Sequence, residues 1–148
     1  MLLPGTVTLV IPGLLVWGSG VNLGWWSAIG AFVLAGGLAL FAWTVALFVH
    51  VGRGTLAPWV ATRHLVVEGP YRYVRNPMIT AVLTILLGEA LMLGNPWIAV
   101  EAAVFFTINA VYFPLSEEPG LRQRFGAEYD RYAENVPRWI PRLRPWSP

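Results

Sequence analysis

The sequence predicts an all-α integral membrane protein with four transmembrane helices and a cytoplasmic, amphipathic C-terminal helix. Of its 148 residues, 56% are hydrophobic and only 12% are charged, whereas a soluble domain carries about 25% charged residues. Residues 1–52 contain no Asp, Glu, Lys or Arg. The apolar residues form four runs without an internal repeat or a low-complexity linker, so we expect one membrane domain over residues 1–148.

The first two predicted spans cover residues 2–20 and 25–51. The first contains Pro4 and Pro12 and ends in a cluster of turn-forming residues. It lacks the basic leading region of a signal peptide, and a second apolar run follows at once, so we expect it to be retained. The second is long enough to cross a hydrocarbon layer of about 30 Å, for which about 20 helical residues suffice.

The third and fourth predicted spans, residues 77–94 and 96–116, form an antiparallel hairpin, because only a short turn at Gly94 separates them. Glu89 and Glu101 lie about equally far from this turn and could approach each other across the hairpin. Acids inside a membrane suggest function by default. Their place near the outer interface favours a structural role here.

The charges predict the orientation. The loop of residues 53–76 has a net charge of +3 (four Arg less one Glu) and the tail of residues 117–148 has +1 (six Arg less five acids), while the two opposite turns have none. The positive-inside rule places this loop, the tail and both termini in the cytoplasm. In the tail, four residues at helical spacing predict the amphipathic helix, lying on a membrane or on its own domain: Leu121, Phe125, Tyr129 and Tyr132.

Composition also excludes several kinds of chemistry. The chain has no cysteine and no lysine, and Asp130 is its one aspartate. Disulfides, thiolate zinc sites, cysteine nucleophiles and lysine Schiff bases are therefore excluded. We expect neither a metal nor a nucleic acid as a partner, and we expect the chemistry on the cytoplasmic side, where the arginines and histidines gather.

Two segments on the predicted cytoplasmic side are similar to the motifs of a known protein family. Residues 65–78 read LVVEGPYRYVRNPM, and residues 117–121 read EEPGL, followed by FGAEYDRY at 125–132 and VPRWIP at 136–141. Together they resemble the isoprenylcysteine carboxyl methyltransferase and phospholipid methyltransferase superfamily of integral membrane enzymes, over about half the chain from His64 onward. The resemblance implies S-adenosylmethionine as the cofactor, and a lipophilic methyl acceptor that reaches the cytoplasmic face from the bilayer.

The resemblance also implies the site residues, and the charges of the cofactor agree with them, since its sulfonium and ammonium need acids and its carboxylate needs an Arg or backbone donors. Family members most often have His at the position of Asn76, and Tyr and Gly at those of Ile79 and Ala81, so these departures affect the details of cofactor contact. If Glu118 binds the cofactor, its replacement by Gln should remove binding with little loss of folding. The implied cofactor-binding residues are His64, Leu65, Gly69, Tyr71, Asn76, Pro77, Glu117 and Glu118; the implied catalytic residues are Arg75, Asn76 and Arg124; the implied substrate-binding residues are Asn109, Tyr112 and Arg122.

Simpler interpretations stay open for each element. Glu117 and Glu118 could have no role other than to begin a helix that Ser116 caps. Arg122 or Arg124 could pair with Glu128 on the surface. Isoprenylcysteine carboxyl O-methylation is the activity most like this pattern. The alternatives are N-methylation of a phospholipid amine, a thiol or other lipid acceptor, and a non-enzymatic small membrane protein that binds no adenosine-containing ligand. The pattern does not indicate an oligomeric state.

Overall fold

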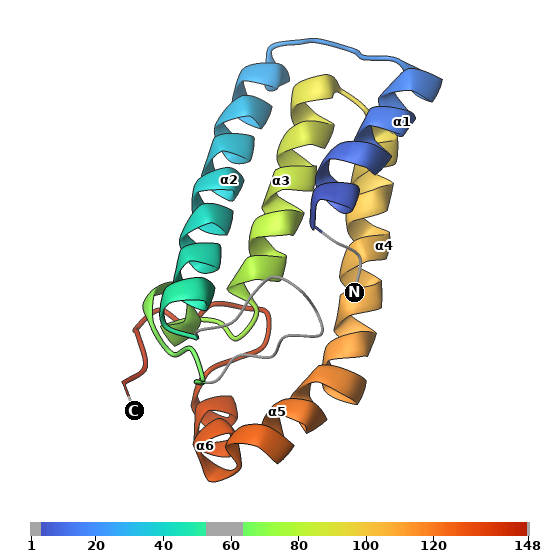
Figure 1. Cartoon of the computed structure of the whole chain (residues 1–148). Coiled ribbons are helices and arrows are strands. Elements are labelled where there is room, and N and C mark those ends of the chain that lie inside the picture. Colours follow the sequence, from blue (N-terminus) through green and yellow to red (C-terminus); the bar gives the residue numbers. More distant parts are fainter. Residues whose placement is uncertain (1–3, 53–63, 148) are drawn as a thin grey trace. The chain divides into compact units, whose positions relative to one another are not determined.

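The computed structural model describes residues 4–52 and 64–147, and within these ranges every regular element is helical (Figure 1). The chain divides into two compact units. Unit 1 comprises Met1–Phe41 and Ile79–Asn109, and unit 2 comprises Ala42–Met78 and Ala110–Pro148. The elements in chain order are η1 (Thr6–Val10), α1 (Ile11–Ser19), α2 (Trp26–His50), η2 (Gly69–Arg72), α3 (Pro77–Leu93), α4 (Pro96–Tyr112), η3 (Phe113–Glu117), α5 (Glu118–Phe125) and α6 (Ala127–Asn135).

Helices occupy all four ranges predicted as spans. The 25 residues of α2 and the 30 residues of the continuous helix Pro96–Phe125 are long and apolar enough to cross a membrane. The helices Thr6–Ser19 and Pro77–Leu93 are apolar but shorter. A topology with four membrane crossings therefore stays a prediction. Residues 53–63, which belong to the predicted cytoplasmic loop of residues 53–76, and the start of the first predicted span lie outside the described residues.

Two predicted helix boundaries differ from the structure. The fourth helix does not end at residue 116, because the chain passes through the π-helix η3 directly into α5. Pro114 has no N–H to donate to the preceding turn, and a π-helical turn accommodates this loss without ending the helix. The predicted amphipathic helix is two helices, α5 and α6, separated at Gly126, whose φ of 52° favours glycine.

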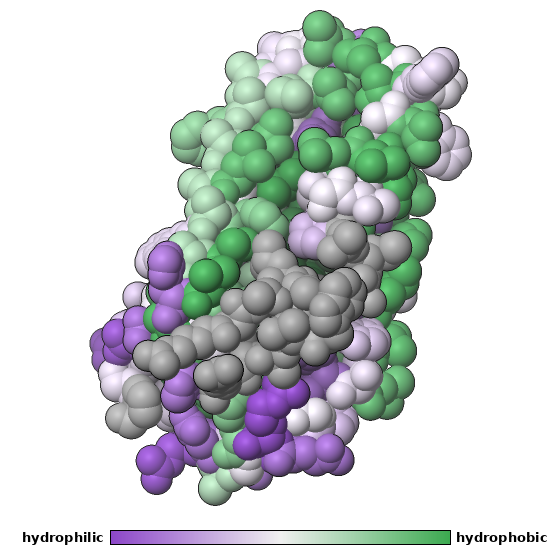
Figure 2. Space-filling view, in the orientation of Figure 1, coloured by the Kyte–Doolittle hydropathy of each residue, from purple (hydrophilic) through white to green (hydrophobic). Residues whose placement is uncertain are grey.

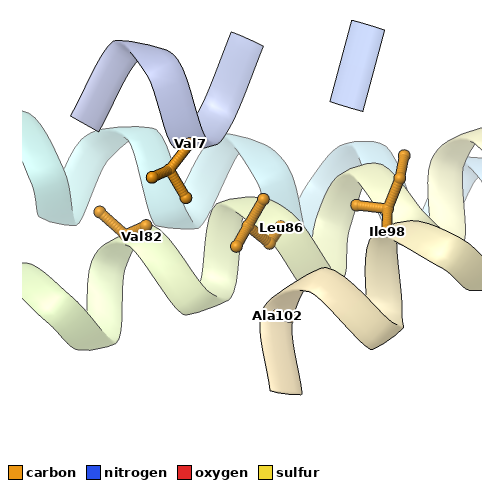
Figure 3. Close-up of a cluster of buried hydrophobic side chains, with 5 residues drawn as sticks. All are labelled: Val7, Val82, Leu86, Ile98 and Ala102. Carbon is orange, nitrogen blue, oxygen red and sulfur yellow. The ribbon is translucent and has the colours of Figure 1, made fainter. Parts of the chain in front are cut away.

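Unit 1 has an apolar core formed by η1, α3 and α4. Figure 3 shows the buried side chains of this cluster: Val7, Val82, Leu86, Ile98 and Ala102. The helices α2 and α3 approach closely here, since a Cβ atom on Gly88 would lie 2.5 Å from the backbone nitrogen of Leu34. Side-chain packing and close backbone contact together fix the helices of this unit.

The turn between α3 and α4 is held by Asn95, which is buried. Its Oδ1 accepts a hydrogen bond from the Trp97 N–H at 3.0 Å, and its Nδ2 donates to Ser19 Oγ at 2.8 Å. The N–H of Asn22 also donates to the carbonyl of Leu93 at 2.8 Å. The predicted tight turn is thus tied to the end of α1.

The outward surface of unit 1 is apolar. Trp17, Phe32 and Trp25 are 88%, 82% and 77% exposed, and green, hydrophobic residues cover much of this unit's surface in Figure 2. Monomeric soluble proteins rarely expose contiguous apolar patches of such extent.

The core of unit 2 contains Tyr129, Tyr132 and Val136, with Leu121 and Phe125 packed against them. These include all four residues of the stripe predicted in the tail. The stripe therefore packs within its own domain.

Candidate functional site

The first motif, residues 65–78, forms a loop in unit 2, and contacts with other parts of this unit hold the backbone of the loop in place. Gly69, at a φ of 53°, begins the 3₁₀-helix η2, and a Cβ atom there would lie 2.9 Å from the Leu47 side chain. The hydroxyl of Tyr132 donates a hydrogen bond to the carbonyl of Tyr71 at 2.7 Å. Burial first, and then the neighbouring Tyr71, raises the pKa of Tyr132, so that this donor keeps its proton at neutral pH.

The C-terminal segment runs along this loop. The N–H of Arg75 donates to Pro137 O at 2.9 Å, and the N–H of Trp146 donates to Arg72 O at 2.9 Å. The Arg72 side chain returns a bond from Nε to Trp146 O at 2.7 Å. Backbone hydrogen bonds at Arg72 and Arg75 thus join the first motif to the C-terminal segment.

Glu118 is the centre of a buried ion cluster, which we call the Glu118 cluster and which comprises Glu118, Arg75 and Arg138. The Glu118 residue is only 5% exposed. Arg138 binds both of its oxygens, Nε to Oε1 at 2.6 Å and Nη2 to Oε2 at 3.0 Å, and Arg75 Nη1 lies 3.2 Å from Oε1. Asn76 joins the cluster by donating from Nδ2 to Arg138 O at 3.3 Å.

The electrostatics of this cluster favour an ionised carboxylate. Burial alone would raise the pKa of Glu118, but the hydrogen bond from Arg138 and the positive charges of Arg75, Arg138 and Arg122 outweigh it and lower that pKa below its usual value. The hydrogen bond to Glu118 in turn raises the pKa of Arg138. Glu118 is therefore negative at neutral pH and a weak base.

The Arg75 side chain has one unsatisfied hydrogen-bond donor in the Glu118 cluster. Arg75 Nε is buried and has no hydrogen-bond partner among the described residues, although Nη1 of the same side chain contacts Glu118 and, at 3.4 Å, the hydroxyl of Tyr129. An unmet guanidinium donor fits a carboxylate such as that of S-adenosylmethionine. Glu118 already accepts two hydrogen bonds from Arg138 and forms an ion pair with Arg75, while a carboxylate offers about four acceptor positions, so it has little capacity left for a ligand.

Unit 2 also contains a cavity of about 800 Å³, within the size range of small-molecule sites. Its lining combines apolar and aromatic side chains with two acids and two arginines. The lining comes from the end of α2, the first motif, α6 and the tail: Val51, Leu65, Val67, Glu68, Gly69, Arg72, Ala127, Glu128, Arg131, Tyr132 and Trp146.

The structure gathers some of the predicted site residues in two places. Arg75, Asn76 and Glu118 meet in the Glu118 cluster, whereas Leu65 and Gly69 line the cavity. Pro77 is fully buried at the start of α3, and Tyr71 offers its carbonyl to Tyr132.

Other predicted residues neither bind within the Glu118 cluster nor line the cavity. The exposed Arg122 pairs with Asp130 at 3.0 Å, not with Glu128, and Arg124 lies over the ring of Phe125. His64 is exposed, and the side chain of Glu117 has no partner among the described residues.

The two residues predicted from the fourth span differ in their surroundings. Asn109, in unit 1, is buried and donates from Nδ2 to the Phe105 carbonyl of its own helix at 2.7 Å. Tyr112, in unit 2, is exposed. The helix-start interpretation of Glu118 also loses support, since α5 has no side-chain cap and Ser116 lies inside the preceding π-helix.

Sequence reasoning missed Arg138 and Trp146 as site residues. Arg138 lies within the VPRWIP motif, and the motif itself was therefore the available signal. For Trp146 the sequence offered only an aromatic residue near the C-terminus. No group of three or more His, Asp or Glu side chains that could hold a metal occurs among the residues that the structure describes.

These features define a helical, strongly apolar protein with a polar site built from two motif segments. Residues 25–128 match the family model of the phospholipid methyltransferases, and the chain belongs to this family of methyltransferases. It is 38% identical to protein-S-isoprenylcysteine O-methyltransferase B and 40% identical to protein-S-isoprenylcysteine O-methyltransferase A, both of Arabidopsis thaliana.

Each of these two matches covers 81 residues, which are 52% of this chain and 39% of the relative, so the chain matches only about two fifths of the length of these plant proteins. An uncharacterised protein of Haemophilus influenzae is 35% identical over 63 residues, 43% of this chain and the whole of that protein. No solved structure matches the chain.

Proposed function

We propose that the protein transfers a methyl group from S-adenosylmethionine to a lipophilic acceptor at the cytoplasmic membrane face, most like isoprenylcysteine carboxyl O-methylation. The observation that carries this proposal is the Glu118 cluster, which draws its charged groups from both motif segments of a phospholipid methyltransferase family member. The similarity to two O-methyltransferases, which covers 52% of the chain, also supports it.

The membrane location is proposed from the surface of the helices. Side chains such as Trp17 and Phe32 are almost fully exposed, and lipid is the environment in which such a surface is stable. All arginines lie in the loop of residues 53–76 and the tail of residues 117–148, and none lies in the predicted opposite turns. We therefore place this loop, the tail, the site and both termini in the cytoplasm.

Within the site, we propose that Arg75 binds a ligand carboxylate through its free Nε, and that Asn76, Tyr71 and Pro77 shape the loop around it. The cofactor supplies an activated methyl group on a sulfonium centre. The protein then has to align the acceptor with this methyl and exclude water, because methyl transfer by direct displacement depends on positioning and desolvation. Cofactor roles for His64 and Glu117, and a catalytic role for Arg124, are part of the same proposal.

The chemistry of the Glu118 cluster favours a carboxylate acceptor over an amine. A carboxylate is already ionised at neutral pH and needs no base, whereas an ammonium must first lose a proton. Glu118 has a lowered pKa and is bound by two arginines, so it is unsuited to take that proton. N-methylation of a phospholipid amine is the second candidate, supported by the family match.

We propose that the acceptor enters sideways from the bilayer, past Asn109 and Tyr112 on the fourth helix, with Arg122 near its polar end. The exposed apolar surface of the helix Pro96–Phe125 supports this route, since Val104, Ile108 and Val111 are more than half exposed. A lipophilic acceptor can approach such a surface without leaving the membrane.

The test uses the full chain purified in detergent. Isothermal titration calorimetry should show saturable binding of S-adenosylmethionine and of its demethylated product. Radiolabelled methyl should then appear in a farnesylated cysteine derivative and not in phosphatidylethanolamine. Label in the amine would select the second candidate, and the absence of binding at millimolar ligand would leave a non-enzymatic membrane protein. The same binding measurement is made on Glu118→Gln, and Glu134→Gln, an exposed change on α6, is its matched control.

A further inference from the structure

We propose that the cavity of unit 2 receives the adenosine end of the methyl donor and that Trp146 is the side chain on which its purine stacks. This inference rests on the proposed function. None of the three residues of the Glu118 cluster lines the cavity, but the first motif contributes to both places, with Gly69 and Arg72 in the cavity lining and Arg75 in the cluster. The two places would therefore contact different groups of one ligand.

The aromatic wall of the cavity suits a flat ring. Trp146 and Tyr132 lie with ring centroids 5.8 Å apart and tilted by 46°, and Leu65 and Val67 add aliphatic surface from the first motif. Tyr132 is almost fully buried, whereas Trp146 is half-buried. Trp146 is therefore the ring with more surface left for a ligand, and Tyr132 packs beside it.

The polar lining suits a ribose. Glu68 and Glu128 line the cavity, are exposed, and have no side-chain partner among the described residues. Carboxylates accept the two hydrogen bonds that a ribose diol donates. With Arg72 and Arg131 the charged lining sums to zero, which fits a nucleoside better than a phosphorylated ligand.

Arg72 is a positioning residue for this wall. Its Nε binds Trp146 O at 2.7 Å, its Nη2 binds Ser147 Oγ at 2.5 Å, and its own carbonyl accepts the Trp146 N–H. These contacts occupy the guanidinium with the tail, so Arg72 acts on a ligand through Trp146.

The experiment measures the dissociation constants of S-adenosylhomocysteine and of adenosine for the detergent-purified full chain. Stacking on an aromatic side chain predicts that Trp146→Ala weakens both ligands by roughly 10–100-fold, and that Trp146→Phe keeps them within about threefold of the wild type. Leu143→Ala, at a fully exposed position of the same tail, is the control and should change nothing.

Ligand fluorescence adds a readout that a merely structural role would not move. Quenching of tryptophan emission on binding should be lost in Trp146→Phe although this variant still binds. If the wild type binds neither ligand, the proposed function fails. If the wild type binds S-adenosylhomocysteine but Trp146→Ala leaves both constants within twofold, the function stands and the adenosine assignment is overturned.

Discussion

Replacing Glu118 by Gln removes the one negative charge that two arginines share. Arg75 is the more sensitive partner, since its side chain is 12% exposed, against 33% for Arg138. Breaking a buried ion pair by removing one partner costs about 3–5 kcal/mol, and the solvent around Arg138 screens its share. We therefore expect a loss of about 3 kcal/mol in the free energy of unfolding, near the lower limit of that range.

This expectation replaces the one from the sequence, which predicted little loss of folding for the same change. At about 2–4 °C per kcal/mol for a chain of this size, the melting temperature should fall by roughly 6–12 °C at neutral pH. The ligand affinity and the melting temperature of Glu118→Gln are therefore measured together, since a loss of folding would also reduce binding.

The pH dependence follows from the direction of the pKa shift. The pKa of Glu118 is lower in the folded state than its usual value of 4.5. Its contribution to stability is then present above that value and is lost as the pH falls through the folded-state pKa. The gap between wild type and Glu118→Gln should be widest near pH 7 and should close on acidification below about 4.5.

Thermal unfolding in detergent, followed by tryptophan fluorescence at several pH values, measures this gap, with Glu134→Gln as the exposed control. A gap smaller than that of the control at neutral pH, or one that stays constant into acid, would refute the reasoning that Glu118 is ionised and stabilised by its two arginines.

Three further predictions concern the membrane part of the chain. Gly88→Ala should lower the melting temperature because its new methyl meets the backbone of α2, whereas Gly36→Ala, which meets nothing within 4 Å, should not; equal melting temperatures would contradict the close helix contact. An impermeant maleimide should label Asn22→Cys from outside intact cells and not Ser147→Cys, and the reverse pattern would invert the topology. Asn109→Leu should raise the acceptor KM and leave cofactor affinity unchanged; the opposite result would make Asn109 a packing residue only.

The helices of unit 1 were largely predictable because their signals are local. The lengths of the apolar runs and the turn at Gly94 determine where α2, α3 and α4 begin and end, within a few residues. The errors occur where the local backbone geometry departs from what the residue pattern predicts. Pro114 does not end its helix, since a π-helical turn absorbs it, and Gly126 divides a stripe whose helical spacing continues across the break.

The site was predictable in its parts and not in its connections. Arg75, Asn76 and Glu118 were expected to act in one site because of their motifs, but Arg138 was not expected to bind Glu118 through both oxygens. The reason is that the tail reaches this place by hydrogen bonds between backbone groups, such as that from Arg75 N to Pro137 O. Every residue other than proline has the same backbone donor, so no residue type marks such a contact in a sequence.

The same contacts explain why one side-chain donor can stay unmet in a buried cluster. The Arg75 N–H is bound by the tail and its Nη1 by Glu118, and Nε has no hydrogen-bond partner among the described residues. A buried donor without a partner costs free energy that a ligand carboxylate would recover on binding. The tail thus holds Arg75 so that its Nε is suited to a negatively charged ligand.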